Sequence, residues 1–271
     1  MIVMRVVVTH DVDHLSVYEH LGDLVIPKFI SLSLIELWKG LIAIDEFKKR
    51  LNELLRNGWN NIGALVKFDK KHGISSTFFV AVEKGLGISY SLESAEQVIK
   101  FLTKEDFDVG LHGINYNNFA LMKQEMNKFR EISGLEEFGI RMHYLRRSES
   151  TLELLNELGY LFDSTVYDEN LRQPYPVGRM LEIPLHIMDT YLFSPFYRAF
   201  TLESAIEYTE TLIKKAREEN KTLVILLHQR HFSPSFSRYM EWYKWIIETA
   251  QDLGAEFLSC REVAERWVKK L

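Results

Sequence analysis

The stretch Met4–His14, which reads M-R-V-V-V-T-H-D-V-D-H, decides the fold of this chain. Its valine run, residues 6–8, is typical of a strand that is buried on both faces, as in a parallel sheet. Four ionisable residues follow at once: His10, Asp11, Asp13 and His14. A helix cap and a solvated turn would need fewer such groups. We therefore expect this strand end to hold a metal, with one carboxylate left for proton transfer.

Length and composition narrow the possible classes of protein. The chain has 271 residues, of which 46% are hydrophobic, enough for one large α/β domain or two small ones. The net charge is −5 and no Lys/Arg cluster stands out, so we expect no binding to nucleic acid. The single cysteine, Cys260, excludes an internal disulfide framework. The first residues lack the pattern of a secretory signal, which predicts a cytoplasmic protein.

The apolar stretch Leu24–Ile44 has about the length of a membrane span. It is interrupted by Pro27, Lys28, Glu36 and Lys39, which a spanning helix would tolerate poorly. We expect an amphipathic helix that covers the core or a partner. The alternative is a lip that touches a lipid-linked substrate.

Beyond this stretch the chain alternates between strand and helix patterns, without a linker or a repeat. Further strands are expected at 76–82, 107–111, 139–142, 160–166, 182–187, 222–227 and 256–259. Helices are expected at 45–58, with Asp45 as N-cap, and at 62–71, 92–102, 118–132, 148–158, 201–216, 238–252 and 261–270. The alternation predicts a parallel sheet, open or closed, and the number of strands favours a barrel.

Five of these strands end at histidine or aspartate. The residues are Asp11 with Asp13, His112, His143, Asp189 and His228. The carboxyl ends of parallel strands meet on one face of a barrel, where its active site lies. Because five strands each end at a histidine or an aspartate, the sequence predicts a site for metal-assisted hydrolysis on this face.

The order of these residues resembles the motifs of the polysaccharide deacetylase family (NodB homology, carbohydrate esterase family 4). Thr9–Asp13 is similar to the opening motif Thr-Phe-Asp-Asp-Gly, with one residue inserted between the aspartates. The resemblance implies that Asp11 is the general base and Asp13 a metal ligand. His112 matches the first histidine of His-x-x-x-His and is implied as a ligand, but Tyr116 stands in place of the second.

The later motifs match in part. Arg141–Tyr144 resembles Arg-x-Pro-Tyr, with His143 in place of proline, and implies that Arg141 orients the base. Leu226–His228 resembles Leu-x-His and implies that His228 is the general acid. The fourth motif is weak, and the segment from Glu182 to Asp189 occupies its place.

The resemblance implies one catalytic domain over residues 1–271, with a helical insertion at about 16–60. The expected fold is α/β, a distorted barrel with about seven parallel strands. The implied activity is metal-dependent removal of N-acetyl, or alternatively O-acetyl, groups from a sugar or a cell-surface polysaccharide precursor. Zinc suits the His/Asp ligand set, although cobalt or nickel would also fit.

Two assignments go beyond the family pattern. His143 lies at a strand end near that of His112, so we expect it to complete the metal site or to contact the water or substrate there. Further substrate contacts are expected from His10, Tyr144, Asp189 and His231.

Two other functions remain open. The missing second histidine is compatible with a non-catalytic carbohydrate-binding relic of the same fold. Asp11 and Asp13 after a valine strand also fit an aspartyl-phosphate phosphatase that uses Asp11 as nucleophile. Such a phosphatase would have no use for His112 and His228.

Overall fold

The computed structural model describes residues 4–269, so the end of the helix expected at 261–270 lies outside the described residues. Strand β1 (Arg5–Val12) is central in the sheet, and its valines at 6–8 are fully buried, as predicted. One edge of β1 pairs with β9 (Thr222–Leu226). The other edge pairs first with β10 (Glu256–Leu258) and then with β2 (Thr77–Val80). All three pairings are parallel, which explains why β1 is apolar on both faces.

The sheet curls from this centre in the order β6-β7-β5-β4-β3-β2-β1-β9-β8. Its remaining strands are β3 (Asp108–Gly113), β4 (Ile140–Met142), β5 (Phe162–Asp163), β6 (Tyr175–Val177), β7 (Met180–Glu182) and β8 (Ile187–Met188). Only the short β6 pairs antiparallel among the strands of residues 4–269. An isolated bridge between Tyr167 and Leu185 joins the β5 side of the sheet to the β8 side. The arrangement confirms the predicted α/β class and distorted barrel.

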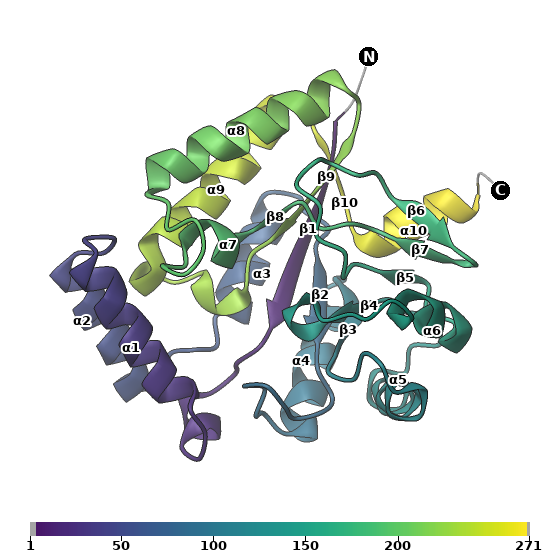
Figure 1. Cartoon of the computed structure of the whole chain (residues 1–271), viewed down its shortest axis with the longest axis horizontal. Helices are drawn as coiled ribbons and strands as arrows, with labels where there is room; N and C mark the ends of the chain where they lie inside the picture. The colour runs from purple at the N-terminus through teal and green to yellow at the C-terminus, as the bar shows by residue number, and fades with distance from the viewer. Residues whose placement is uncertain (1–3, 270–271) are drawn as a thin grey trace.

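Helices surround the outside of the sheet (Figure 1). They are α3 (Ile62–Lys71), α4 (Leu92–Lys104), α5 (Phe119–Ser133), α6 (Thr151–Leu158), α8 (Leu202–Glu218), α9 (Ser237–Asp252) and α10 (Cys260–Val268). The side chains of Ser91, Thr201 and Ser259 cap α4, α8 and α10 by accepting backbone N–H bonds. Such caps satisfy donors that the first helical turn leaves free.

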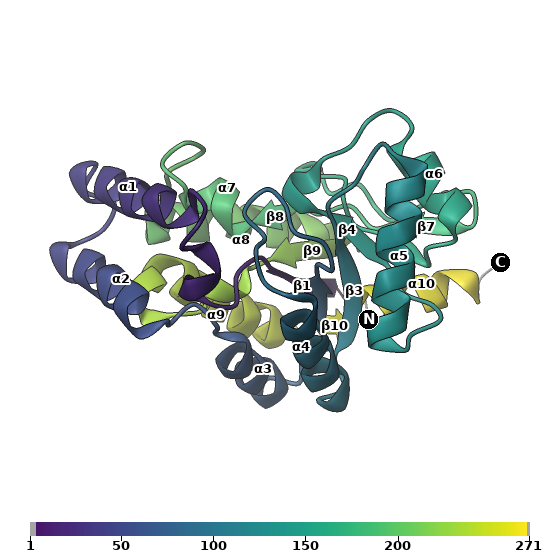
Figure 2. The same ribbon diagram turned by 90° about the horizontal axis from the view of Figure 1, so that it is seen from below.

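Helices α1 (Val25–Trp38) and α2 (Ile44–Arg56) stand together at one side of the molecule, away from α6 and α10 (Figures 1 and 2). The predicted segment Leu24–Ile44 is broken, because Gly40 adopts a left-handed φ of +68° that ends α1. The predicted cap Asp45 is wrong, since Ala43 occupies that position and Asp45 lies in the first turn.

A buried ionic network fastens these two helices to α9. Arg50 of α2 pairs with Glu36 of α1 and, at 3.0 Å, with Glu46, while Arg238 of α9 donates to Glu36 at 3.2 Å. Removal of one partner would leave a buried charge unpaired, so the network fixes the position of α1. Across residues 4–269, no helix combines the length and the apolar character that a membrane crossing needs.

The strand predicted at 182–187 is divided in the structure. Glu182 ends β7, which pairs with β5, whereas β8 begins at Ile187 and pairs with β9. Pro184 lies between them and has no N–H to offer a sheet ladder. Similarly, the strand predicted at 160–166 keeps only the two residues of β5. The short helix α7 (Asp189–Phe193) follows β8 at once.

Two carboxyl groups face each other across β5 and β7. Asp163 and Glu182 are register partners, both are fully buried, and one oxygen of each has no hydrogen-bond partner in the structure. Burial raises the pKa of both groups, and the Asp163 carboxylate raises the pKa of Glu182 further, well above its ordinary value. The pair is therefore most stable when it holds a proton.

We expect Glu182→Gln to stabilise the protein at pH 8 by about 1–3 kcal/mol, the scale for a buried group without a partner. A folded-state pKa above the unfolded one gives stability that is present at low pH and lost as the pH rises through the folded value. The advantage of the variant should therefore be small near pH 4 and grow toward pH 8. Denaturant titrations at both pH values test this. The exposed Glu149→Gln is the matched control, and an advantage that does not change with pH would contradict the shared proton.

Candidate metal and catalytic site

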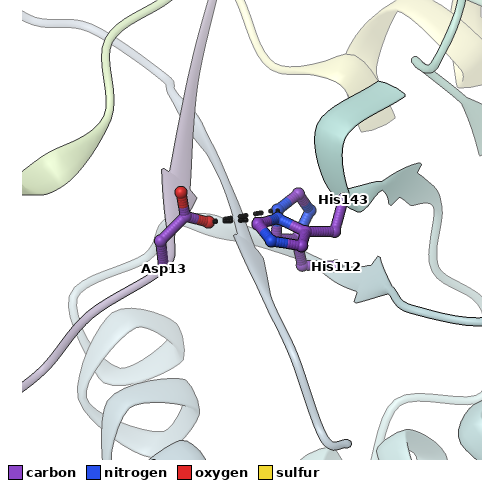
Figure 3. A group of neighbouring side chains, drawn as sticks. All are labelled: Asp13, His112 and His143. Atoms are coloured by element: carbon purple, nitrogen blue, oxygen red, sulfur yellow. Dashed lines mark hydrogen bonds and ion pairs between the residues drawn. The ribbon is translucent and has the colours of Figure 1, made fainter. Parts of the chain in front are cut away.

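Three side chains converge at the carboxyl ends of strands β1, β3 and β4 (Figure 3). Asp13 follows β1, His112 lies in β3, and His143 begins the turn after β4. Nε2 of His112 lies 3.0 Å from Nδ1 of His143, and Oδ1 of Asp13 lies 3.3 and 3.5 Å from these two nitrogens. The group could hold a metal ion, because one ligand atom of each residue lies within 4.8 Å of the others.

Hydrogen bonds to the backbone fix how the two histidines face this centre. Nδ1 of His112 donates to the carbonyl oxygen of Arg141 at 3.0 Å, and Nε2 of His143 donates to that of Leu86 at 3.2 Å. In its neutral form each ring therefore turns a lone pair inward. Oδ1 of Asp13 is buried there without a hydrogen-bond partner. Three electron-rich atoms with no proton between them fit a divalent cation, and the bonds to carbonyls are those expected of histidine ligands.

The turns that carry these groups have unusual backbone conformations. Leu86, Tyr144 and Leu145 all have left-handed φ values, of +54°, +56° and +52°. Residues other than glycine seldom adopt such values, and they cluster where function fixes the geometry. The conformation of Leu86 lets its carbonyl oxygen reach His143. The conformation of Tyr144 places its ring against that of His143, with the two centroids 4.1 Å apart.

Asp11 is held beside this centre by a buried arginine. Nη1 of Arg141 donates to Oδ1 of Asp11 at 3.0 Å and to Thr9 at 2.8 Å, while its other nitrogens donate to the backbone and side chain of Ser164. The second oxygen of Asp11 lies 3.8 Å from Nε2 of His112. Because Arg141 is fixed on every side, Asp11 has little freedom to turn and is available to the centre as a proton acceptor.

A second carboxylate holds two histidines on the opposite side. Oδ1 of Asp189 accepts from Nδ1 of His228 and Oδ2 accepts from Nδ1 of His231, both at 2.7 Å. Nε2 of His228 then lies 3.7 Å from Oδ2 of Asp13. These three residues are also close enough to hold a cation. Their facing atoms are already paired with one another, so they fit a metal less well than the first group.

The electrostatics of the two histidines differ. Burial lowers the pKa of His228, but the adjacent Asp189 carboxylate outweighs this effect and raises it to about 9. Burial dominates at His231 and lowers its pKa to about 4, although Asp189 acts in the opposite direction. Near neutral pH, His228 therefore carries a proton that it can donate, and His231 is neutral.

A cavity of about 670 Å³ lies over these groups, within the range of small-molecule sites. The polar side contributes Asp11, Asp13, His14, His143, His228, Arg230 and His231. Helix α1 contributes apolar residues, among them Val25, Phe29 and Leu32, and the segment after α7 contributes Pro195, Phe196 and Tyr197. The cavity therefore combines a polar, titratable end with apolar and aromatic walls.

Among the expected substrate contacts, Tyr144 and His231 line this cavity, whereas His10 and Asp189 do not. His10 is fully buried, with Nδ1 bonded to the carbonyl of Leu227 and Nε2 3.1 Å from Asp69. Asp189 is occupied by its two histidines. The structure therefore places both side chains outside the cavity lining, His10 against Asp69 and Asp189 against His228 and His231.

Tyr116, which stands in place of the family's second histidine, packs against Arg146. Its ring lies under the guanidinium of Arg146, 4.4 Å from centroid to Cζ, and it does not line the cavity. Tyr116 therefore offers no imidazole at that position, and the structure places His143 beside His112.

On the polar side of the cavity, His14 and Arg230 are the two residues to which the sequence analysis gave no individual role. Nδ1 of His14 lies 3.0 Å from Nε2 of His20, whose Nδ1 is bonded to Asp23 at 2.8 Å. Burial and the nearby Arg230 lower the pKa of His14 well below its ordinary value. Arg230 itself lies two residues after His228, and that proximity in sequence is the one signal that could have identified it.

Comparisons with known proteins agree with this architecture. No protein-family model and no curated protein matches the chain. Among solved structures, a protein from Mycobacterium smegmatis assigned as a polysaccharide deacetylase superposes with a TM-score of 0.68 and 17% identity, over 98% of this chain and 91% of that one. The chain has the polysaccharide deacetylase fold.

The polysaccharide deacetylase fold also includes inactive members. A carbohydrate esterase family 4 pseudoenzyme from Bacillus anthracis superposes with a TM-score of 0.53 and 9% identity, over 96% of this chain and 65% of that one. A mutant of that pseudoenzyme, described as having restored enzymatic activity, gives the same TM-score and identity. The fold alone therefore does not decide whether a chain is active, and its side chains must do so.

Proposed function

We propose that this protein is a divergent polysaccharide deacetylase, a metal-dependent hydrolase that removes N-acetyl groups from a sugar. One observation carries the proposal. The inward-facing atoms of Asp13, His112 and His143 leave space for a cation, between a carboxylate held by arginine and a histidine held by aspartate. A catalytic metal commonly has three protein ligands and one open position.

Asp13, His112 and His143 would hold the metal, and zinc suits this mixture of oxygen and nitrogen ligands. When bound, a divalent cation supplies Lewis-acid activation of a water molecule and of the acetyl carbonyl. Asp11 takes the proton from the attacking water, since Arg141 holds its carboxylate in place beside the centre. Arg141 is a positioning residue, as it contacts Asp11 and not the cavity.

His228 gives a proton to the departing sugar nitrogen. Asp189 fixes its ring through Nδ1, so Nε2 is the nitrogen that faces the cavity. His228 is protonated near neutral pH because its pKa is raised to about 9. General acid and base groups each contribute on the order of 10²–10⁴-fold to the rate. Tyr144 and His231, which line the cavity, are placed to contact the sugar.

The acetylated substrate would be a sugar or a polysaccharide precursor. A lipid-linked form has some support, because Leu24, Trp38, Phe196 and Tyr197 are exposed apolar residues on the two segments that wall the cavity. The cytoplasmic location, the helical insertion at about 16–60 and the absence of nucleic acid among the partners remain predictions, as does the alternative of O-acetyl groups.

The relic hypothesis remains the main alternative, since the fold includes a pseudoenzyme. The pairing of Asp11 with Arg141 and of His228 with Asp189 favours an active enzyme, because a relic needs neither. A phosphatase is disfavoured, since its nucleophile would lie among histidines and not beside a second acidic pair for magnesium.

Protein purified without chelator should contain about one equivalent of a divalent metal and release acetate from at least one N-acetylated sugar. Metal analysis by mass spectrometry and an acetate assay on a panel of N-acetylated sugars test this. Chelation should abolish the release, and added zinc should restore it. Bound metal without acetate release would favour the relic, and release unaffected by complete metal removal would refute the mechanism.

A further inference from the structure

Arg230 lies in the wall of the cavity with its guanidinium among aromatic rings. Its Cζ lies 5.1 Å from the ring centroid of Phe29, 5.0 Å from that of Trp59 and 5.4 Å from that of Phe236. These rings stabilise the cation, but they do not accept the strong hydrogen bonds of its five N–H donors. Within residues 4–269 the side chain has no hydrogen-bond partner and no ion pair.

Two acidic side chains of the cavity, Asp11 and Glu36, are neutralised by buried arginines. Asp11 pairs with Arg141 and Glu36 pairs with Arg50, whereas Asp13 and Asp23 face histidine rings. Lys28, whose Nζ lies 5.8 Å from the Tyr144 centroid, resembles Arg230 in having no ion pair among the described residues. Arg230 and Lys28 are therefore two cations of the cavity that have no acidic partner among the described residues.

Glu53 is the acidic residue that most affects Arg230, but it does not neutralise it. Its Oε1 accepts from Ser233, its Oε2 has no hydrogen-bond partner, and neither lies within 4.0 Å of Arg230. Burial lowers the pKa of Arg230 to about 10, although Glu53 acts to raise it. Arg230 is thus charged near neutral pH while its donors are free to bind a ligand.

We propose that Arg230 is an oxyanion-binding residue of the cavity, which receives a phosphate or carboxylate group carried by the sugar substrate. The proposal rests on the proposed function for the presence of that sugar. Arginine presents two parallel N–H donors that match both kinds of oxyanion. Lys28, on the wall formed by α1, would add a second positive charge. The substrate is then an acidic saccharide, either phosphorylated or containing a uronate.

Binding measurements can test this without turnover. All proteins carry Asp11→Asn, so that the acetyl group stays in place, and calorimetry at pH 8 gives the affinities. The probes are N-acetylglucosamine 1-phosphate, the methyl glycoside of N-acetylglucosaminuronate and the neutral methyl N-acetylglucosaminide. We expect at least one acidic probe to bind tenfold or more tightly than the neutral one. Which acidic probe does so distinguishes phosphate from carboxylate.

Arg230→Gln should remove this preference, whereas Arg172→Gln should keep it. Arg172 is the matched control, because its guanidinium also lies on an aromatic ring, 3.8 Å from the Tyr175 centroid, but outside the cavity. Equal binding of all probes to the parent protein, or a preference that persists in Arg230→Gln, would overturn the proposal. If Arg230→Gln does not fold, Arg230→Met, which keeps an apolar side chain among the rings without the charge, decides, and an unchanged preference in that variant overturns the proposal.

Acetate release from the wild-type protein is measured separately. A protein that prefers the acidic probes through Arg230 and releases no acetate would retain the binding site and lose the proposed enzyme activity. A protein that releases acetate but does not prefer the acidic probes would have the proposed enzyme activity and lack the oxyanion-binding site.

Discussion

Asp11→Asn is expected to abolish turnover and to leave the metal bound. The substitution keeps the shape of the side chain and its contact with Arg141 but removes the basic oxygen that faces the centre. The loss should be on the order of 10²–10⁴-fold in kcat, the contribution of a general base. Steady-state kinetics and metal analysis of the same sample test both parts.

Asp13→Asn is the matched comparison, since the same change is made two residues away. Oδ1 of Asp13 faces both histidines, so this variant should lose the metal together with the activity. If Asp11→Asn loses the metal and Asp13→Asn keeps it, the roles of the two aspartates are reversed. Full activity in Asp11→Asn would remove the carboxylate from the mechanism.

The sequence was sufficient to locate these aspartates because parallel strands bring their carboxyl ends to one face. Each apolar run could be recognised locally, and the residue at its end then had a defined place. Asp13, His112 and His143 come together for this reason, although more than a hundred residues separate the first from the last. The same reasoning could not show which of these residues binds a metal and which transfers a proton, because that depends on the hydrogen bonds of each side chain.

His10 shows where the strand-end argument was too coarse. Successive side chains of a strand point to opposite faces, so Asp11 and His10 cannot both face the site. Asp11 turns toward His112, and His10 turns toward Asp69, which also accepts from Tyr243 at 2.6 Å. Strict alternation within β1 would have separated the two residues before the structure was known.

Other features depend on contacts between distant segments and had no local signal. The rings around Arg230 come from α1, from the segment before α3 and from the turn before α9. The position of α1 in turn depends on the pairing of Glu36 with Arg50 and Arg238. The polar residues within Leu24–Ile44 argued against a membrane span, but the sequence did not show which residues Glu36 would pair with.

The third metal ligand is where the chain departs most from the family pattern, and the second large effect is expected there. His143→Ala should weaken metal binding at least tenfold, the scale for a lost contact at a metal site. Its Nδ1 lies 3.0 Å from Nε2 of His112 and 3.5 Å from Oδ1 of Asp13, so its removal would leave only two ligands. Competition titration with a chromogenic chelator gives the affinity.

Tyr116→Phe is the control that separates the two possible third ligands. The ring of Tyr116 lies under the guanidinium of Arg146, and a neutral phenol is a poor zinc ligand, so this variant should bind metal as the wild-type protein does. A loss confined to Tyr116→Phe, or unchanged affinity in both variants, would contradict the assignment of His143. A loss confined to His143→Ala would mean that a histidine in the third motif replaces the missing histidine of the second. The register of β3 and β4 permits this exchange, because it pairs His112 with Arg141 and so places His143 just beyond the same strand end.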